Sequence, residues 1–555
     1  MQTRGKLGTA VILTLGLLMV AAAAVNFGLA QSASAPAAGT ALWVETYGTM
    51  ILPDRPEGTV KEIALAGARN EYVCAQLALR TEQEAEKPFT FEWTALKGPG
   101  EAAIAKEKIM LYRAADIDVT RGSNENKCKD ALRARPLGKF PDALVPLYDK
   151  EGANVANSIK PEPNKTAAFW VDILIPAGTP TGQYAGSIAL KTDGATLTVP
   201  VKVRVADVEI PAEATIPSMY NLRLDFKNAT KYVDGYVAEA LAHRLQPTQY
   251  HGSDGSMPQD LVDKFNPGGK GCFSMYVSDT QPLSDEKLQN LKKLTEHLKE
   301  RKLFDQSWLQ LKDEAGKEYW AGMVGVVKQI QEAMPEWKGK VLATFSSKSD
   351  SELDPYINYQ VTPLRCYGNW GWTKYDGREE WVTRREKGQH LWFYVSNNQG
   401  TPYPTFDIDT PTVAFEPRVM AWAWWYEKAE GHLYWDLMFV PGWKLNPKFP
   451  PGDGQLMYPG DFTLPGAPDW VLVKEIKQPV VSRRMKIFRQ GLQEWELLKL
   501  AEKKLGYDKV APIVAEAYTC MGTKDASLPK PVWSYDEAAW DKARAAVIAL
   551  LEEKK

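Results

Sequence analysis

The pattern of apolar and polar positions changes character near residue 211. Before it, short runs such as YVCAQLALR (72–80), FWVDILIPAG (169–178) and GQYAGSIALK (182–191) are separated by proline and glycine. In GATLTVPVKVRVADV (194–208), valines alternate with polar residues. Period-two alternation between turn signals is typical of antiparallel strands. Residues 42–211 are therefore predicted to form an all-β domain, an antiparallel β-sandwich.

Strand-like runs alternate with helical patterns after residue 211. SDEKLQNLKKLTEHLKERKL (284–303) places leucines at helical spacing behind a capping Ser284, and His297 of this helix is predicted to be exposed. Strand-like runs occupy 307–314, 340–346, 359–369, 389–398 and 430–439. Repeated strand-then-helix units predict α/β architecture, here a (β/α)8 TIM-type barrel over residues 212–505. Residues 506–555 are predicted to be a helical C-terminal extension.

The first 41 residues have a different pattern. Arg4 and Lys6 precede the apolar run GTAVILTLGLLMVAAAAV, and small residues lead to Ala30. This order is typical of a secretory signal peptide, so residues 1–30 are predicted to be a signal, followed by a small-residue linker at 31–41. We expect a periplasmic or extracellular protein without a membrane span in the mature chain. An uncleaved membrane anchor is the alternative, because the apolar run is nearly long enough to span.

Composition narrows the partners. Lysine and arginine number 67 and aspartate and glutamate 69, a net charge of −2 that provides no positive field for nucleic acid. The five cysteines and five histidines are scattered, which fits neither a disulfide framework nor a metal site, so no cofactor or metal is expected. The 19 tryptophans exceed what a core usually requires. They indicate either sugar-stacking platforms or packing between domains.

An unusual acid pair ends one predicted strand. In WLQLKDEAGKEYW (308–320), Asp313 and Glu314 are adjacent and precede Ala315 and Gly316. Ideal strand alternation sends neighbouring side chains to opposite faces, so both acids can share a pocket only if the backbone twists there. The functional interpretation is a carboxylate pair for glycosidic cleavage, since barrel active sites lie where strands end. A solvated surface Asp-Glu is the commoner alternative.

Aromatic, amide and acidic residues gather at other strand ends. Rings stack on the apolar faces of sugars and polar groups bind hydroxyls, so this mixture suits a sugar cleft. The alternative is packing between barrel and sandwich. The first predicted barrel strand, YNLRLDF (220–226), places Asn221, Arg223 and Asp225 on one side, which is either a pocket wall or a structural ion pair. The candidate substrate-binding residues are Tyr367, Asn369, Trp370, Tyr394, Asn397, Tyr434, Trp435 and Asp436.

Several motifs, in this order, resemble glycoside hydrolase family 123 and its bacterial relatives. They are WLQLKDEAG, the segment from WFYVSNNQG to HLYWDLMF, GDGQLMYPG and VSRRMKIFRQGLQEWELL; ARNEYVCAQLALR and VDILIPAGTPTGQYAGSIAL resemble that family's N-terminal sandwich. The resemblance implies a retaining β-N-acetylgalactosaminidase that uses the substrate's own 2-acetamido group as nucleophile. Glu314 would be the general acid/base, and Asp313 would hold the acetamido N–H and stabilise the oxazolinium.

The relatives commonly carry proline where this chain has Ala315, so the loop after the acids is expected to differ in shape. Two other functions stay open. One is a glycosidase for a non-acetylated sugar, with an acid such as Asp436 as nucleophile. The other is a catalytically silent glycan-binding or envelope protein that retains the barrel. The natural glycan and the oligomeric state do not follow from the sequence.

Overall fold

A computed structural model describes eleven stretches of the chain. They are 39–122, 136–192, 194–223, 232–248, 259–269, 272–344, 351–363, 377–396, 403–440, 442–518 and 533–553. The predicted signal and nearly all of the predicted linker lie outside them. Within these stretches, no helix combines the length and the apolar character needed to cross a membrane.

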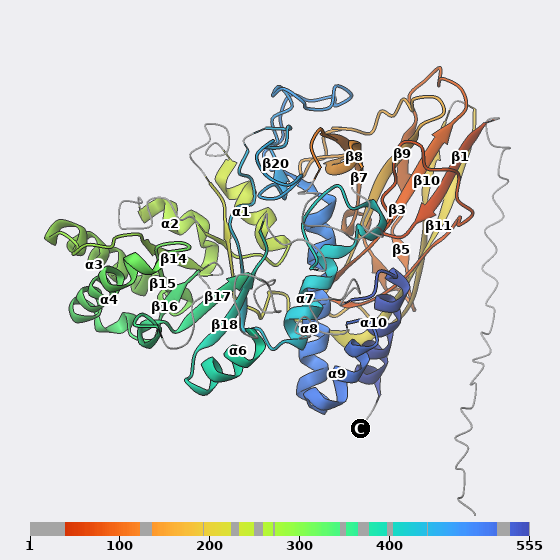
Figure 1. Ribbon diagram of the computed structural model, residues 1–555. Helices are drawn as coiled ribbons and strands as arrows, with labels where there is room; N and C mark the ends of the chain where they lie inside the picture. The colour runs from red at the N-terminus through yellow and green to blue at the C-terminus, as the bar shows by residue number, and fades with distance from the viewer. Residues whose placement is uncertain are drawn as a thin grey trace, which may run out of the picture. The chain divides into compact units, whose positions relative to one another are not determined.

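Two β-sheets face each other in the N-terminal part (Figure 1). The first has the order β1-β3-β9-β7-β8-β21-β20 and is antiparallel throughout. Its strands are β1 (Thr40–Glu45), β3 (Glu71–Thr81), β7 (Ile109–Val119), β8 (Gly138–Pro146), β9 (Thr166–Ile175), β20 (Met457–Tyr458) and β21 (Val480–Ser482). The last two strands come from a segment that follows the barrel's final strand.

The second sheet has the order β2-β11-β10-β5-β6, with β4 also paired to β10. Its pairs are antiparallel except β2 with β11, which run parallel. Its strands are β2 (Ile63–Arg69), β4 (Thr90–Trp93), β5 (Leu96–Lys97), β6 (Ala103–Ile104), β10 (Gly182–Lys191) and β11 (Thr196–Glu209). Both sheets supply the core between them, so the predicted sandwich is confirmed.

Burial explains why apolar and polar residues alternate in β11 but not in β3. In β11, Val199, Val201 and Val203 point into the core between the sheets, while Pro200 and Lys202 are exposed. In β3 nearly every residue is buried, because one face packs against the second sheet and the other faces helix α8. A strand covered on both faces has no polar side to display.

The middle of the chain forms an eight-stranded parallel sheet that is nearly closed into a barrel. The order is β13-β12-β19-β18-β17-β16-β15-β14, and every pair in it is parallel. Its strands are β12 (Ser218–Asn221), β13 (Pro247–Thr248), β14 (Phe273–Val277), β15 (Ser307–Leu311), β16 (Val341–Ala343), β17 (Tyr359–Pro363), β18 (His390–Tyr394) and β19 (Gly431–Tyr434). The last strand, β19, pairs with the first, β12, as a (β/α)8 barrel requires.

Helices follow the strands, as the sequence pattern predicts. They are α1 (Val233–Ala242), α2 (Gln259–Phe265), α3 (Asp285–Glu300), α4 (Trp320–Ala333), α6 (Gly377–Glu386) and α7 (Glu416–Tyr426), followed by α8 (Arg483–Leu505), α9 (Tyr507–Ala515) and α10 (Glu537–Glu552). Ser284 caps α3 by accepting from the Lys287 amide, as predicted. The prediction for His297 is wrong: it is buried and contacts Asp263 of α2 at 3.0 Å.

Helix α8 joins the barrel to the first sheet through buried ion pairs. Arg484 donates to both carboxylate oxygens of Asp142 on β8, at 2.9 and 2.8 Å. Asp172 on β9 accepts from Lys486 at 2.6 Å and from Arg489 at 2.7 Å. Residues 483–498 of the helix are buried, and carboxylates of the first sheet offset the charges of the buried Arg484, Lys486 and Arg489.

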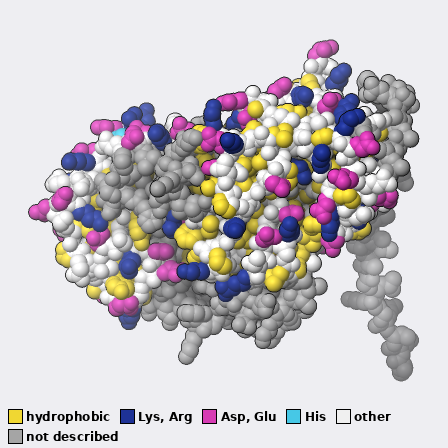
Figure 2. Space-filling view, turned by 90° about the horizontal axis from the view of Figure 1, so that it is seen from above, with side chains coloured by type: hydrophobic (Ala, Val, Ile, Leu, Met, Phe, Trp, Pro, Cys, Tyr) yellow, Lys and Arg dark blue, Asp and Glu magenta, His cyan; other side chains and the backbone are white. Residues whose placement is uncertain are grey.

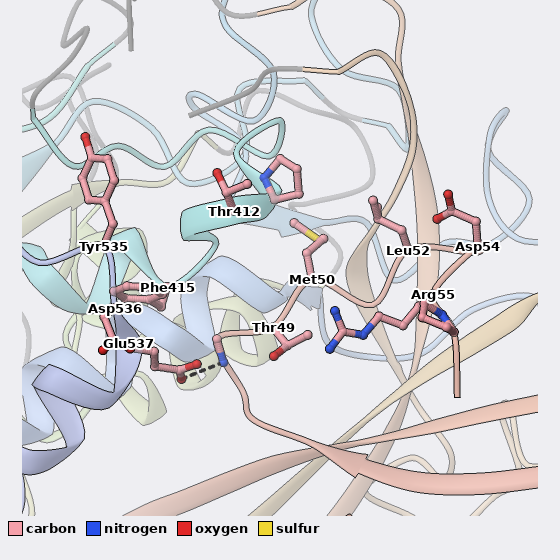
Figure 3. A pocket seen from close by; sticks show the side chains of 13 residues that line it. Thr49, Met50, Leu52, Asp54, Arg55, Thr412, Phe415, Tyr535, Asp536 and Glu537 are labelled. Carbon is pink, nitrogen blue, oxygen red and sulfur yellow. Dashed lines mark hydrogen bonds between the residues drawn. The ribbon is translucent and has the colours of Figure 1, made fainter. Parts of the chain in front are cut away.

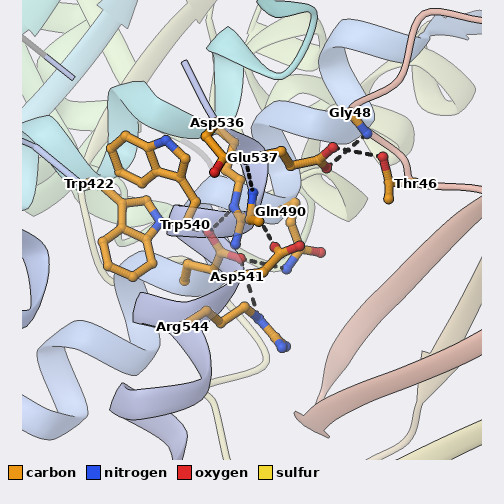
Figure 4. Close-up of polar contacts among 12 residues, drawn as sticks. Thr46, Gly48, Trp422, Gln490, Asp536, Glu537, Trp540, Asp541 and Arg544 are labelled. Carbon is orange, nitrogen blue, oxygen red and sulfur yellow. Dashed lines mark hydrogen bonds and ion pairs between the residues drawn. The ribbon is translucent and has the colours of Figure 1, made fainter. Parts of the chain in front are cut away.

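The C-terminal helix α10 is attached in the same manner (Figure 4). Glu537 at its start accepts from the Thr46 hydroxyl at 2.7 Å and from the Gly48 amide at 3.1 Å. Further along, Asp541 accepts from Arg418 of α7 at 2.6 Å, and Arg544 donates to Glu71 of β3. The predicted C-terminal extension is thus helical and bound to both the sandwich and the barrel helices.

Candidate active site

The acid pair lies immediately beyond β15, which ends at Leu311 rather than running through Glu314 as predicted. Leu309 and Leu311 belong to the core shared with α3 and α4, whereas Trp308 belongs to the cluster inside the barrel. Continued alternation would direct Asp313 outward, toward the helices. Because the strand stops first, the chain can turn and bring both acids over the barrel's carboxyl end.

The contacts of Asp313 place it there. Its backbone N–H donates to the hydroxyl of Tyr276 on β14 at 3.3 Å, and its carboxylate accepts from the hydroxyl of Thr344, just after β16. Partial removal from water raises the pKa of Asp313, and the negative charge of Glu314 acts in the same direction. The Thr344 hydrogen bond opposes both effects, because it stabilises the charged form.

Glu314 has the backbone twist that the sequence required. Its φ is +44°, in the left-handed region that side chains other than glycine rarely adopt. Its Oε1 accepts a hydrogen bond from the hydroxyl of Tyr394, at the end of β18, at 3.1 Å. Five other non-glycine residues in the described stretches have a positive φ, so the value is notable at Glu314 because it turns the side chain toward Tyr394. Both acids remain accessible to solvent, as groups that meet a substrate must be.

Ala315 is compatible with this turn. It is buried in the core outside the barrel, and its carbonyl accepts from the Trp320 indole at 3.1 Å. A proline at this position would favour an extended conformation for the residue before it. Alanine leaves Glu314 free of that restriction, which gives the predicted difference in loop shape a physical basis.

The three candidates at the end of β19 have different surroundings. Tyr434 is fully buried and donates to Asp453 at 3.0 Å. Asp436 is also fully buried, and it pairs with Arg223 at 2.7 Å and accepts from the Met438 amide. Arg223 therefore belongs to an ion pair, formed with Asp436, whereas Asp225 lies outside the described residues. Trp435 alone of the three is partly exposed.

The remaining candidates fall outside the described residues. Tyr367, Asn369 and Trp370 lie between residues 363 and 377, and Asn397 lies just after residue 396. Sequence reasoning also missed two residues that contact the acids, Tyr276 and Thr344. Tyr276 lies on β14 and Thr344 directly follows β16, the two strands next to β15, but no sequence motif marks either residue. Predicting them requires knowing that β14 and β16 flank β15, which local sequence patterns do not reveal.

Metal ligands are not grouped in the part of the chain that the structure describes, where no cluster of three or more histidine, cysteine, aspartate or glutamate side chains occurs. Cys74 and Cys272 are buried thiols whose pKa values burial raises. The other three cysteines lie outside the described residues. The chemistry that the described acids offer is proton transfer and electrostatic stabilisation, which carboxylates supply by themselves.

A cavity of about 610 Å³ lies elsewhere (Figure 3). The segment from Gly48 to Pro56, residues 411–415 just before α7, and the start of α10 with the two residues before it line this cavity, and neither acid does. Basic side chains (lysine and arginine) and acidic side chains (aspartate and glutamate) are interspersed over the face shown in Figure 2. The candidate active site therefore rests on the acid pair and its place on the barrel, not on cavity size or surface charge.

A parallel barrel with two carboxylates at the carboxyl ends of its strands is an arrangement found in one class of enzyme, the glycoside hydrolases, among others. The chain matches the family model "Glycoside hydrolase 123, catalytic domain" over residues 270–501 and "Glycoside hydrolase 123 N-terminal domain" over residues 47–192. The chain belongs to glycoside hydrolase family 123. This confirms the resemblance, the fold class and the assignment as a glycoside hydrolase.

One solved structure of the same family shares the fold. A family 123 glycoside hydrolase from Clostridium perfringens, described for glycolipid glycan hydrolysis, superposes with a TM-score of 0.66 at 14% identity, covering 93% of this chain and 97% of its own. An endo-β-1,4-mannanase from Thermotoga petrophila gives a TM-score of only 0.30 at 10% identity, covering 51% of this chain and 77% of its own. The comparison with curated protein sequences finds no match.

Proposed function

We propose that the protein is an exported glycosidase that removes terminal β-linked N-acetylhexosamine, with N-acetylgalactosamine the preferred sugar, and retains the anomeric configuration. One observation carries the proposal. Asp313 and Glu314 stand side by side at the barrel's carboxyl end, with separate partners on β14, β16 and β18. Export rests on the N-terminal sequence pattern. The related Clostridium perfringens enzyme, described for glycolipid glycans, suggests a glycoconjugate substrate.

In the first step Glu314 donates its proton to the glycosidic oxygen as the bond to C1 breaks. The carbonyl oxygen of the substrate's 2-acetamido group attacks C1 and forms an oxazolinium, and Asp313 accepts the acetamido N–H and balances the positive charge. In the second step Glu314 takes a proton from water, which attacks C1 and restores the acetamido group. Two displacements at C1 give net retention.

Adjacency of the acids favours this scheme over a conventional retaining pair. A conventional pair spans the scissile bond with its carboxyl groups about 5 Å apart, one as nucleophile and one as acid. Here neither carboxylate needs to reach C1, because one serves the leaving oxygen and the other serves the amide beside it. Asp436, the alternative nucleophile, is fully buried and held by Arg223, which counts against a glycosidase for non-acetylated sugars.

The test is Glu314→Gln assayed on a chromogenic β-N-acetylgalactosaminide. We expect kcat/KM to fall by about 10²–10⁴-fold, the usual contribution of a general acid/base. Glu318→Gln is the matched control, an exposed glutamate four residues away, and it should leave turnover unchanged. Wild-type turnover by Glu314→Gln would exclude the assignment. If the wild-type protein binds the glycan but releases no sugar from it, the alternative of a catalytically silent glycan-binding protein would be favoured.

A second assay addresses the acetamido group. The matching β-galactoside has a 2-hydroxyl in its place and cannot form an oxazolinium, so its hydrolysis should be slower by several orders of magnitude. Comparable rates for the two glycosides would rule out substrate assistance and leave a glycosidase of another mechanism. A thiazoline analogue of the oxazolinium should also inhibit competitively, since it resembles the charged intermediate.

A further inference from the structure

The indole of Trp435 is held by a turn that comes from a distant part of the loop after β19. Its Nε1 donates to both carboxylate oxygens of Asp453, at 3.1 and 3.2 Å. The rings of Phe439 and Phe449 pack against it, with centroids 4.9 and 5.2 Å away. Trp435 is nevertheless partly exposed, so it is fixed at its polar edge and among aromatic rings while some of its surface remains available.

Glycine is required beside this ring. Gly454 has a φ of +69°, and a Cβ added there would lie 2.3 Å from Cζ2 of Trp435 and 2.6 Å from its Cη2. The tip of the six-membered ring of the indole thus occupies the space that any side chain at 454 would take. The Gly454 amide also donates to the hydroxyl of Tyr434 at 2.6 Å. The turn is therefore shaped to the tryptophan on one side and to the end of β19 on the other.

Burying the carboxyl group of Asp453 at this position costs free energy. It is buried, and desolvation raises the pKa of its carboxyl to about 7, with the charge of Asp407 acting in the same direction. The hydrogen bonds from Trp435 and Tyr434 and the charge of Arg484 lower the pKa but do not cancel the effect. Packing alone would be served better by an apolar residue. The carboxylate is explained if the orientation of the indole matters.

The turn at Asp453 and Gly454 is itself held to the sandwich through Arg484. Arg484 of α8 donates to the carbonyl of Gly452 at 2.8 Å and to the carbonyl of Gln455, the residues that flank the turn. The same guanidinium is held by both carboxylate oxygens of Asp142 on β8. A chain of hydrogen bonds therefore runs from the first sheet, through Arg484, to the turn that fixes Trp435.

Trp435 also lies at the end of the barrel where the acids are. Tyr394, which contacts Glu314, is level with Leu433 in the parallel pairing of β18 and β19. Trp435 follows two positions beyond that level, at the carboxyl end. An aromatic ring held rigidly at the same end of the barrel as the acid pair is suited to the apolar face of a hexose ring.

We propose that Asp453 and Gly454 are positioning residues that fix the indole of Trp435 as the platform for the sugar in the active site. This rests on the proposed function, because it needs a sugar at the barrel mouth. Neither residue touches substrate. Their effect should therefore appear mainly in KM, since the platform holds the sugar in the ground state and the transition state alike.

The experiment compares steady-state kinetics of Trp435→Ala, Gly454→Ala, Asp453→Ala and Asp453→Asn on the chromogenic N-acetylgalactosaminide. We expect Trp435→Ala to raise KM about tenfold, the scale of a ring stacking contact. Gly454→Ala and Asp453→Ala should raise KM several-fold with kcat changed less than about twofold. Asp453→Asn should have a smaller effect, because it keeps one oxygen to accept from the indole.

Gly388→Ala is the matched control. Gly388 has a φ of +76°, but a Cβ there meets nothing within 4 Å, so the variant carries the same backbone strain without displacing a ring. A double-mutant cycle adds a readout that general instability would not move. Phenylalanine lacks the outer atoms Cζ2 and Cη2, so Gly454→Ala should raise KM less in a Trp435→Phe background than in the wild type.

The outcomes are separable. If Trp435→Ala raises KM and both Asp453→Ala and Gly454→Ala keep the wild-type KM, the positioning proposal is wrong and the platform stands. If Trp435→Ala itself keeps the wild-type KM while Glu314→Gln is inactive, the platform is wrong and the catalytic assignment stands. Should Gly454→Ala fail to fold, the ranking of Asp453→Ala above Asp453→Asn in KM decides, and equal KM values would contradict the proposal.

Discussion

The buried carboxylate of Asp172 should be among the most costly side chains to neutralise. Asp172→Asn removes the negative charge but keeps the shape. In the wild type, Asp172 accepts from Lys486 at 2.6 Å, from Arg489 at 2.7 Å and from the indole of Trp170 at 2.7 Å. Asparagine would leave two buried cations without a counter-charge. Breaking a buried pair in this way costs about 3–5 kcal/mol.

A matched control isolates burial from distance. Glu151 and Lys477 form an ion pair of 2.7 Å, almost the length of the Asp172 contacts, but both side chains are 69% exposed. Asp172, Lys486 and Arg489 are 0–3% exposed. Since exposed pairs are screened by water, Glu151→Gln should not measurably change stability. If distance set the energy, the two variants would behave alike.

The assay is chemical denaturation followed by circular dichroism, comparing midpoints at unchanged m-values. Burial by itself raises the pKa of Asp172, but Arg489 and Lys486 bring it well below its ordinary value. Its stabilising effect is therefore present above the unfolded pKa of about 3.9 and is lost as pH falls through the lower folded pKa. The gap between wild type and variant should narrow below about pH 4. Equal midpoints for Asp172→Asn and Glu151→Gln would refute the reasoning.

Three further outcomes are expected. Thr344→Val removes the hydrogen bond that lowers the pKa of Asp313, so the acidic limb of the kcat/KM profile should move to higher pH, and an unchanged limb would separate Asp313 from the pH dependence. Gly491→Ala places a Cβ 2.5 Å from the carbonyl of Arg418 where α7 and α8 cross, and should cost about 1–3 kcal/mol in unfolding free energy. Gly325→Ala in α4 meets nothing within 4 Å and should instead stabilise by about 0.5–1 kcal/mol.

Local sequence patterns predicted the helices and strands better than they predicted which of these elements pack against each other. The helix α3, its Ser284 cap and the strand ending at the acid pair all follow from periodicity and short-range chemistry. The burial of His297 does not, because it depends on α2 lying beside α3. The strands β20 and β21 were not predicted either, because they have only two and three residues and β21 pairs with β8, which lies far away in the sequence.

The candidate site divides along the same line. The adjacent acids could be recognised from the sequence, and so could the need for a backbone twist, which appears as the positive φ of Glu314. Tyr276 and Thr344 could not be recognised, because strand order alone brings them to Asp313. The burial of Asp436 also escaped prediction. The sequence pattern of an acidic residue after a strand is the same whether its carboxylate is exposed to solvent or paired with an arginine.

The ion pairs of α8 impose an order on biosynthesis. Asp142 and Asp172 lie on strands that leave the ribosome early, but Arg484 comes 342 positions after the first and Lys486 comes 314 positions after the second. At translation rates of about 5–20 residues per second, the two carboxylates wait roughly 15–70 s for their cations. Strand β21, which pairs with β8, is equally late. The first sheet of the nascent chain therefore lacks its last two strands and the buried cations of α8 until the barrel has been made.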